Sequence, residues 1–362
     1  LPREALREDP TAGAAPRALI VRIDEVIEPI LQQFVDRQLQ LAKQNGTNLI
    51  IFEIESPGGY LVASTQMADA IASLEAEGIK SVAYIPKQAL SGAAIIALGC
   101  DQIVMHADAK IGDAGPIELG PGGQFQHAPE KILSVLKPTM RDLAIKKKRP
   151  HALAEAMCDR NLIVYECTNK TDGRIWYMSD DDLHLAPDEW VKGHAVRETV
   201  GGFFFTATGE RAHLLKLAEP VVQDFDELKR RLGIPADVSV PYAQRTWVDT
   251  LVWILNTPAM TVFLFMAGIF CIYLEAHFPH GLFGIGACVC FALFFWSRFL
   301  GGTAGWLEVV LFILGVACLM LEFFIVPGFG VFGISGGVLI LISLILASQT
   351  FVIPATAEDF HK

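Results

Sequence analysis

Three short segments of the chain carry residue types that suit acyl-transfer chemistry, and one of them contains a candidate nucleophile. Ser91 and Gly92 precede a run of small and apolar residues, which predicts a serine hydroxyl at the start of a helix. Such a serine can cap the helix, or it can attack a carbonyl carbon while the amide of Gly92 helps to hold the oxyanion that forms. The residues of this segment leave both interpretations open.

The other two segments are glycine-containing turns. Ser56-Pro57-Gly58-Gly59 ends a predicted strand, and glycines at a strand end allow backbone amides to face a substrate. The segment with Gly112, Asp113 and Ala114 follows another predicted strand and could run beside a substrate backbone. Either segment could equally be a plain turn, so neither identifies a site by itself.

A largely parallel α/β sheet is expected to position these segments. Apolar runs typical of strands alternate with helical patterns, at residues 19–23, 49–54, 81–85 and 102–105, and this alternation predicts βαβ units. A long helix, kinked or interrupted at Pro138, is expected from Lys131 to Lys148, and its basic end, Lys146 to Arg149, is expected to be solvated. Residues 163–206 predict a small β-rich appendage.

The final third of the chain differs in kind. Its residues from Leu251 to Thr350 include only four charged ones, which are Glu275, Arg298, Glu308 and Glu322. Four apolar stretches, at 259–274, 282–296, 306–326 and 331–346, have about the length that a helix needs to cross a bilayer once their flanks are included. We therefore expect an all-α transmembrane bundle of four helices.

Charge and cysteine content disfavour some classes of protein. The net charge is −11, and a nucleic-acid partner is not expected because phosphate binding needs a basic face. The seven cysteines show no spacing typical of a metal site, so we expect no metal and no other cofactor. Cys158 and Cys167 could form a disulfide, although spacing alone does not establish the geometry.

Taken together and in order, the three segments resemble one superfold. They read Glu-Ser-Pro-Gly-Gly, then Ser-Gly-Ala-Ala-Ile-Ile-Ala-Leu-Gly-Cys-Asp-Gln-Ile-Val-Met, then Ile-Gly-Asp-Ala-Gly-Pro. This combination resembles the membrane-protease branch of the ClpP/crotonase superfold and is most similar to the NfeD family, also called stomatin operon partner proteins. The resemblance covers residues 18–222, and the glycine-rich stretch from Pro327 extends it into the apolar helices.

The resemblance implies an α/β ClpP-like domain with the β-rich appendage, ahead of the transmembrane helices. We expect residues 1–17 to be a mature or trimmed N-terminal segment, 18–240 the serine protease domain and 241–350 the transmembrane domain. Residues 351–362 are expected to be a tail, without the C-terminal OB-like domain of long family members.

The resemblance also implies a Ser–Lys dyad. Ser91 matches the nucleophile, and Lys131, which follows an expected loop over residues 120–128, matches the base. A lysine acts as a base only in its neutral form, which partial burial and a helix N-terminus both favour. The amides of Gly59 and Gly92 would form the oxyanion hole. Lys137 is a substitute base.

Other side chains near these segments are not expected to act as the base. Arg141 does not deprotonate in proteins. His106 and His127 are expected to be packing or surface residues, because the family does not use histidine.

By the same resemblance, the chain is expected to be a membrane-anchored serine endopeptidase that cleaves apolar peptide segments. The expected substrate and partner is a stomatin-like (SPFH) membrane protein, and further expectations are self-association as a dimer or larger oligomer and contact with membrane lipid. The protein is expected in the cell membrane, multi-pass, with the protease domain extracytoplasmic. The alternatives are a non-catalytic partner that assembles with SPFH scaffolds and, less favoured, a crotonase acting on acyl-CoA.

Overall fold

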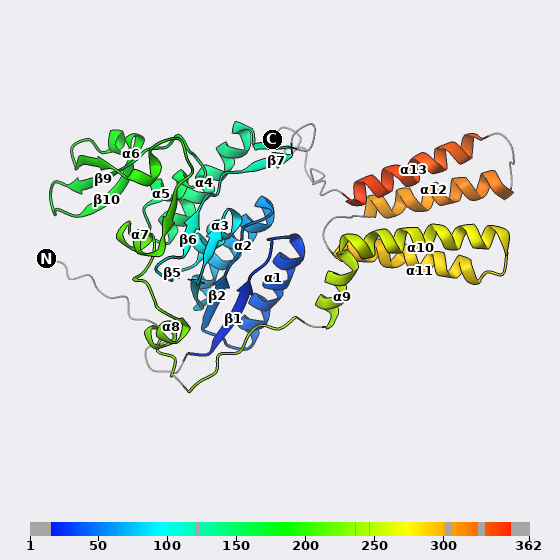
Figure 1. The fold of residues 1–362 in the computed structure, drawn as a ribbon, viewed down its shortest axis with the longest axis horizontal. Helices are drawn as coiled ribbons and strands as arrows, with labels where there is room; N and C mark the ends of the chain where they lie inside the picture. Colours follow the sequence, from blue (N-terminus) through cyan, green and yellow to red (C-terminus); the bar gives the residue numbers. More distant parts are fainter. Residues whose placement is uncertain are drawn as a thin grey trace. The chain divides into compact units, whose positions relative to one another are not determined.

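The computed structural model describes residues 16–119, 124–235, 237–245, 247–300, 306–324 and 330–348. By its contacts the chain forms two compact units, Leu1–Gln244 and Arg245–Lys362 (Figure 1). Each unit is described separately below.

A parallel four-stranded sheet is the centre of the first unit. Its strand order is β1-β2-β3-β5, formed by β1 (Ala18–Ile23), β2 (Leu49–Ile54), β3 (Lys80–Ile85) and β5 (Gln102–Met105). These strands are mostly apolar because both faces of the sheet are covered, and their polar residues include Arg22, Glu53 and Lys80. The predicted parallel α/β fold is confirmed, and all four predicted strands are present.

The large core lies on one face of the sheet, where residues from three helices pack with alternate strand residues. These are α1 (Pro29–Gln44), α2 (Leu61–Ser73), which continues into the short 3-10 helix η1 (Leu74–Glu77), and α3 (Gly92–Gly99). A smaller cluster covers the other face, with contributions from α8 (Phe225–Arg231) and the segment around Val240. Helix α3 is buried along all eight residues, so its N-terminus is held firmly by its surroundings.

A second, three-stranded sheet positions the loops that were predicted to carry chemistry. Its order is β12-β6-β4, with β4 (Gln88–Leu90) parallel to β6 (Lys110–Gly112) and β12 (Thr206–Thr208) antiparallel to β6. A two-stranded hairpin follows, formed by β7 (Ile117–Leu119) and β8 (Phe125–His127). Part of the loop predicted at 120–128 is therefore strand β8, because residues 125–127 pair with β7, and residues 120–123 lie outside the described residues.

The long helix α4 (Glu130–Lys146) comes next and continues through Pro138, so the helix is present as predicted but it is not interrupted there. It is followed by α5 (His151–Ala156) and by the predicted β-rich appendage, an antiparallel sheet of order β10-β9-β11. The appendage comprises β9 (Val164–Asn169), β10 (Ile175–Ser179), α6 (Asp180–Leu185), β11 (Trp190–Ala195) and η2 (Arg197–Thr199), and α7 (Gly209–Leu214) follows β12.

The second unit is helical. A short helix, α9 (Trp247–Asn256), precedes two antiparallel hairpins, α10 (Pro258–His277) with α11 (Leu282–Leu300) and α12 (Trp306–Phe324) with α13 (Val331–Ser348). Among the described residues, one helix, Leu282–Phe299, is long and apolar enough to cross a membrane alone. Asp249–Asn256 and Ala259–Glu275 meet the same criterion only as one bent pair. Helices occupy the described residues of all four apolar stretches, and the four-span arrangement stays a prediction.

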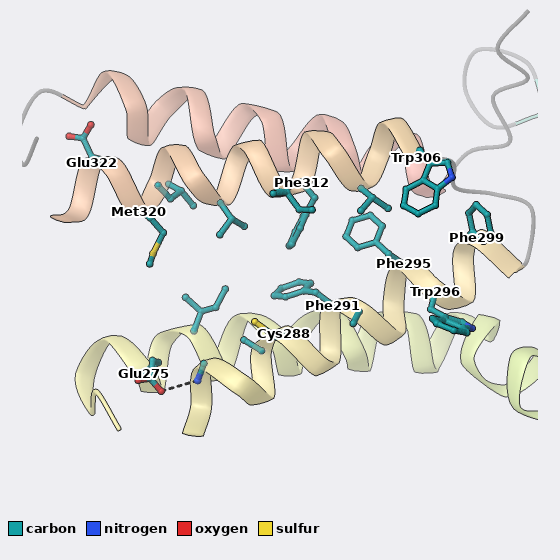
Figure 2. A pocket seen from close by; sticks show the side chains of 18 of the residues that line it. Glu275, Cys288, Phe291, Phe295, Trp296, Phe299, Trp306, Phe312, Met320 and Glu322 are labelled. Atoms are coloured by element: carbon teal, nitrogen blue, oxygen red, sulfur yellow. Dashed lines mark hydrogen bonds between the residues drawn. The ribbon is translucent and has the colours of Figure 1, made fainter. Parts of the chain in front are cut away.

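The turns of the two helical hairpins contain the same set of hydrogen bonds, in which one glutamate accepts from two glycine amides. Both glutamates, labelled in Figure 2, also line an open apolar groove within the second unit. Glu275 accepts hydrogen bonds from the amides of Gly281 (2.6 Å) and Gly284 (2.8 Å). Glu322 accepts them from Gly330 (2.7 Å) and Gly333 (3.3 Å). In each hairpin the carboxylate thus satisfies amides at the start of the second helix, where the helix dipole favours a negative charge. The sequences there also match, as Gly-Leu-Phe-Gly-Ile at 281–285 and Gly-Val-Phe-Gly-Ile at 330–334.

Candidate active site around Ser91

The Ser56–Gly59 turn and the Ser91 turn are packed directly against each other. A Cβ atom built on Gly58 would lie 2.5 Å from the Cβ of Ser91 and 2.9 Å from the amide nitrogen of Gly92. Strand β4 fixes this contact, because the amide of Ser56 donates to the carbonyl of Gln88 (3.1 Å) and the amide of Leu90 donates to the carbonyl of Ser56 (3.2 Å). Two segments that are more than thirty residues apart thus meet at a position that only glycine can occupy.

Ser91 has a strained backbone, with φ 54° and ψ −126°. A residue with a side chain rarely adopts this conformation, and such outliers cost about 1–3 kcal/mol each. The segment around Gly112 holds Ser91 in this conformation, since the amide of Ser91 donates to the carbonyl of Gly112 (3.0 Å). Ser91 occupies the N-cap position of α3, yet its side chain makes no capping hydrogen bond. The capping interpretation therefore does not hold for its hydroxyl, which is partly exposed.

The two glycine amides have different surroundings but share one property. Ile27 and Gly59 form a parallel bridge, in which Ile27 donates to Gly58 (2.9 Å) and Tyr60 donates to Ile27 (2.8 Å). This pattern turns the N–H of Gly59 away from Ile27. Gly92 is the first residue of α3, so its N–H has no partner within the helix. Neither amide donates to another protein group in the described part of the chain.

Neither Gly59 nor Gly92 leaves room for a side chain. A Cβ on Gly59 would lie 2.2 Å from the carbonyl oxygen of Ile27, and a Cβ on Gly92 would lie 2.0 Å from the Ser64 hydroxyl. The backbone therefore passes close to its neighbours at both glycines. Because the N–H groups of Gly59 and Gly92 have no acceptor in the described part of the chain, they are suited to hold a negatively charged oxygen.

The predicted substrate-binding loops divide into supporting and exposed positions. Ser56 is buried, and its hydroxyl donates to the carbonyl of Glu25 (2.7 Å) and accepts from the amide of Gly58 (3.1 Å), so it supports the turn. Pro57, the next residue, is exposed.

The segment after β6 is fixed by the chain around it. The amide of Asp113 donates to Phe205 (3.0 Å), and the amide of Ala114 donates to Met157 (2.7 Å). Gly112 and Asp113 both have positive φ, 131° and 51°. The exposed Asp113 lies next to the residue whose carbonyl accepts the hydrogen bond of Ser91.

The two candidate lysines differ in their partners. Lys131 lies in the first turn of α4 and is exposed, and its carbonyl accepts a hydrogen bond from Ser134 (2.8 Å). Lys137 forms an ion pair with Asp159, with 2.8 Å between Nζ and Oδ2. Burial alone would lower the pKa of Lys137, but the hydrogen bond and charge of Asp159 outweigh it and raise the pKa. Lys137 is therefore held in its charged form.

The histidines and cysteines show no arrangement for catalysis or metal binding in the described residues. His127 Nε2 lies 3.1 Å from Arg160 Nη1, and its ring packs edge-on against Phe204. No hydrogen bond in the described part of the chain links His106 or His127 to Ser91, and no cluster that could hold a metal ion is found there. Cys158 and Cys167 are buried free thiols, so the disulfide considered from the sequence is not formed.

The basic end of α4 is only partly solvated: Lys146 and Lys148 are exposed, as predicted, but Lys147 and Arg149 are not. Lys147 is buried and pairs with Asp101 and with Glu75 (3.3 Å). Arg149 is buried as well, and it donates to the carbonyls of Leu98 and Cys100 (both 2.8 Å) at the C-terminal end of α3. Burial lowers the pKa of Arg149 to about 10. These two cations hold the opposite end of the helix that begins at Ser91, and the contacts responsible are too distant in sequence for a local pattern to reveal.

Comparison with known proteins gives matches over both units. The model of the NfeD1b N-terminal domain matches residues 17–184, and that of the NfeD integral membrane domain matches residues 259–360. Membrane protein NfeD1b of Bacillus subtilis is 29% identical over 339 residues, which are 93% of this chain and 68% of the relative. Membrane-bound protease PH1510 of Pyrococcus horikoshii is 25% identical over 319 residues, 86% of this chain and 64% of the relative. The chain thus spans about two thirds of these relatives.

Solved structures with some similarity include two of a 1510-N membrane protease. One, in complex with a substrate peptide, has a TM-score of 0.47 and 22% identity, covering 67% of this chain and all of that one. The other, described as specific for a stomatin homolog from Pyrococcus horikoshii, has a TM-score of 0.41 and 19% identity over the same shares. ClpP1 from Listeria monocytogenes has a TM-score of 0.35 and 15% identity, covering 58% of this chain and 94% of that one.

Proposed function

The chain belongs to the NfeD family, and from this premise we propose that its first unit is a serine peptidase with Ser91 as nucleophile and Lys131 as general base. One observation supports the proposal above others. Ser91 is held in a strained conformation at the start of a buried helix, and its side chain does not cap that helix. Strain of this kind gathers at functional sites, where the surrounding structure imposes it.

The proposed reaction follows from the groups around Ser91. Neutral Lys131 takes the hydroxyl proton while Oγ bonds to the carbonyl carbon of the substrate, and the carbonyl oxygen becomes an oxyanion. The amides of Gly59 and Gly92 stabilise this oxyanion, and one such donor is worth about 100–1000-fold in rate. The C–N bond then breaks, the amine leaves with the proton from Lys131, and water hydrolyses the acyl-enzyme by the reverse sequence of proton transfers.

Lys131 is a better candidate than Lys137 because of the partners of each. Lys137 is ion-paired with Asp159, which keeps it protonated and unable to accept a proton. Lys131 lies exposed in the first turn of α4, and no ion pair with an acidic side chain is found for it in the described part of the chain.

The relatives suggest the class of substrate. The solved 1510-N protease carries a description as specific for a stomatin homolog, so we propose apolar peptide segments of a stomatin/SPFH-type membrane protein as substrate. The NfeD membrane domain makes the chain a membrane protein. Within the proposal it is multi-pass through four spans, contacts lipid, assembles as a dimer or larger oligomer and carries its peptidase unit outside the cytoplasm.

The test is labelling of the detergent-purified chain by a fluorophosphonate probe. Wild type and Lys137→Ala are expected to label, whereas Ser91→Ala and Lys131→Ala are expected not to. Equal labelling of Ser91→Ala would show that the probe reacts elsewhere. Absence of labelling in folded wild type would refute the peptidase and favour a non-catalytic partner of SPFH scaffolds, a function that Ser91→Ala would perform as well as wild type.

A further inference from the structure

The aromatic ring of Phe204 contacts two segments of the candidate active site. The para end of the ring lies against Gly115, where a Cβ atom would be only 2.2 Å from the ring carbon Cζ. The ring of His127 packs edge-on against the same ring, with 5.6 Å between the centroids. Gly115 belongs to the loop whose carbonyl accepts from Ser91, and His127 ends β8, which leads into α4. The ring thus connects the nucleophile side of the site with the side that carries Lys131.

We propose that Phe204 is a positioning residue, which holds the β7–β8 hairpin in the place from which Lys131 reaches Ser91. The inference rests on the proposed function in one respect, which is that Lys131 is the general base. The contact between Phe204 and the hairpin does not depend on that role, so the contact and the role can be measured separately.

The backbone next to the ring is fixed to the loop that holds Ser91. Phe205 is fully buried, and its carbonyl accepts a hydrogen bond from the amide of Asp113 (3.0 Å). Asp113 directly follows Gly112, whose carbonyl accepts from the amide of Ser91 (3.0 Å). Phe204 therefore projects from a backbone that is linked to the nucleophile turn by two hydrogen bonds in succession.

The β7–β8 hairpin needs an anchor because it belongs to no larger sheet in the part of the chain that the structure describes. Its two strands have three residues each and pair with one another. An isolated hairpin of two strands is marginally stable at best in water. His127, the last residue of β8, contacts Phe204 and also Arg160, whose Nη1 lies 3.1 Å from Nε2. The hairpin is thus held to the rest of the unit at the residue where it leads towards α4.

The position of β8 limits where Lys131 can lie, because the lysine follows His127 by only four residues. The amide of Ala128 donates to the carbonyl of Pro116, next to β7 (2.9 Å). Pro129 has a fixed φ and is the N-cap of α4. A shift of β8 is therefore passed on to the first turn of α4, and a displacement of about 1 Å at a reacting group changes rates by about 100-fold.

The experiment compares Phe204→Ala with Phe203→Ala in the detergent-purified full chain. Phe203 is the matched control, because it is the adjacent residue with the same side chain and is 74% exposed. By hydrogen–deuterium exchange and mass spectrometry, residues 125–132 are expected to exchange roughly tenfold faster or more in Phe204→Ala. Their exchange should be unchanged in Phe203→Ala. Unchanged exchange in both variants overturns the proposal.

The rate of fluorophosphonate labelling measures whether the hairpin delivers the base. Phe204→Ala is expected to label at least about tenfold more slowly than wild type. Its residual rate should also lose the dependence on pH that comes from the ionisation of Lys131. A chain that is merely destabilised would keep the pH dependence of wild type at a lower rate. Faster exchange together with an unchanged labelling rate overturns the positioning role.

A further substitution approaches the same contact from Gly115. Its φ is not positive, so alanine fits the backbone, but the added methyl group would overlap the ring of Phe204. Gly115→Ala should therefore slow labelling in wild type and change the rate by less than about twofold in Phe204→Ala, where the ring is absent. Additive effects of the two substitutions contradict a shared contact. If folded wild type does not label at all, the peptidase is refuted, and the exchange measurement still decides whether Phe204 holds the hairpin.

Discussion

Gly58 and Ser91 are in contact so close that a methyl group on the first would overlap the second. The Cβ-to-Cβ distance would be 2.5 Å, and Gly58 has φ 99°, a conformation that residues with side chains rarely adopt. The backbone of the turn after β2 therefore packs directly against the turn that contains Ser91, with no side chain between them. The position of Ser91 depends on this contact as much as on the helix that it begins.

Gly58→Ala is expected to displace Ser91 and slow its reaction with a fluorophosphonate by about 100-fold, because a displacement of about 1 Å at a reacting atom has effects of this size. The matched control is Gly78→Ala. Gly78 also has positive φ, 75°, but a Cβ there would meet nothing within 4 Å. Both variants carry the backbone penalty of about 1 kcal/mol, and only Gly58→Ala carries the overlap. Similar labelling rates for the two variants would mean that the contact does not position Ser91.

Ser91→Gly is expected to stabilise the first unit by about 1 kcal/mol or more, because glycine adopts φ 54°, ψ −126° without the strain of a side chain. Ser91→Ala is the control, since it also removes the hydroxyl but retains the strained Cβ. Both variants should lose labelling, and only glycine should raise the urea midpoint. Equal midpoints for the two variants would contradict a strained nucleophile and indicate that Ser91 rests comfortably in its turn.

Much of the fold and of the Ser91 cluster could be predicted because the signals are local. The buried parallel strands are mostly apolar, and each glycine turn comes directly after a strand or before a helix. Several features depend on partners that are far apart in sequence and could not be found locally. The backbone amide of Ser91 donates to Gly112, about twenty residues later, and Arg149 donates to carbonyls about fifty residues earlier.

The repeated Glu–Gly turn has a sequence signal in its two matching pentapeptides. These lie within apolar stretches, whose length and hydropathy predict helices but no contact between a glutamate and glycine amides. The carboxylates become informative only once Glu275 and Glu322 are seen to hold the equivalent amides. The pairing of Lys131 with Ser91 stays a prediction, because no contact between the two is observed.

The buried acid Glu155 is expected to make stability depend on pH. It accepts hydrogen bonds from Arg141 Nε (2.7 Å) and pairs with His151 Nδ1 (3.1 Å), while Asp182 lies 3.7 Å from both partners. Burial alone would raise the pKa of Glu155, but the hydrogen bonds of His151 and Arg141 outweigh it and lower the pKa below the ordinary 4.5.

A carboxyl group whose pKa is depressed in the folded state stabilises the fold above its ordinary pKa, and this contribution is lost as the pH falls through the folded value. Glu155→Gln should therefore lower the unfolding free energy by about 2 kcal/mol near pH 7, since Arg141 loses its charged hydrogen-bond acceptor and keeps only Asp182, 3.7 Å away, and by much less in acid. The control Glu77→Gln removes a partly exposed pair with Lys43 and should cost less than about 1 kcal/mol. Urea unfolding near pH 7 and in acid measures the unfolding free energy of wild type and of each variant. If Glu155→Gln were as destabilising in acid as near pH 7, the lowered pKa of Glu155 would be contradicted.

Cys158 is expected to be inert in the folded protein. Its side chain is buried, its thiol donates to the carbonyl of Glu155 (3.2 Å), and burial raises its pKa to about 12. Because the thiolate is the reactive form, iodoacetamide near pH 8 should leave Cys158 unmodified while it alkylates a control cysteine introduced in the first unit by Leu185→Cys, at a side chain that is 83% exposed. Peptide mass spectrometry after brief labelling distinguishes the two sites.

The same labelling, repeated in urea without reductant, distinguishes a buried thiol from a disulfide. Free Cys158 and Cys167 should both become alkylated once the chain unfolds, because burial alone protects them. A Cys158–Cys167 disulfide would instead keep both unmodified until a reductant is added. Protection that survives unfolding would therefore show that the oxidised pair exists in the protein, and that β9 is tied covalently to the segment after α5. Full alkylation in urea would show that both thiols are free. The segment after α5 would then be held by noncovalent packing around Glu155.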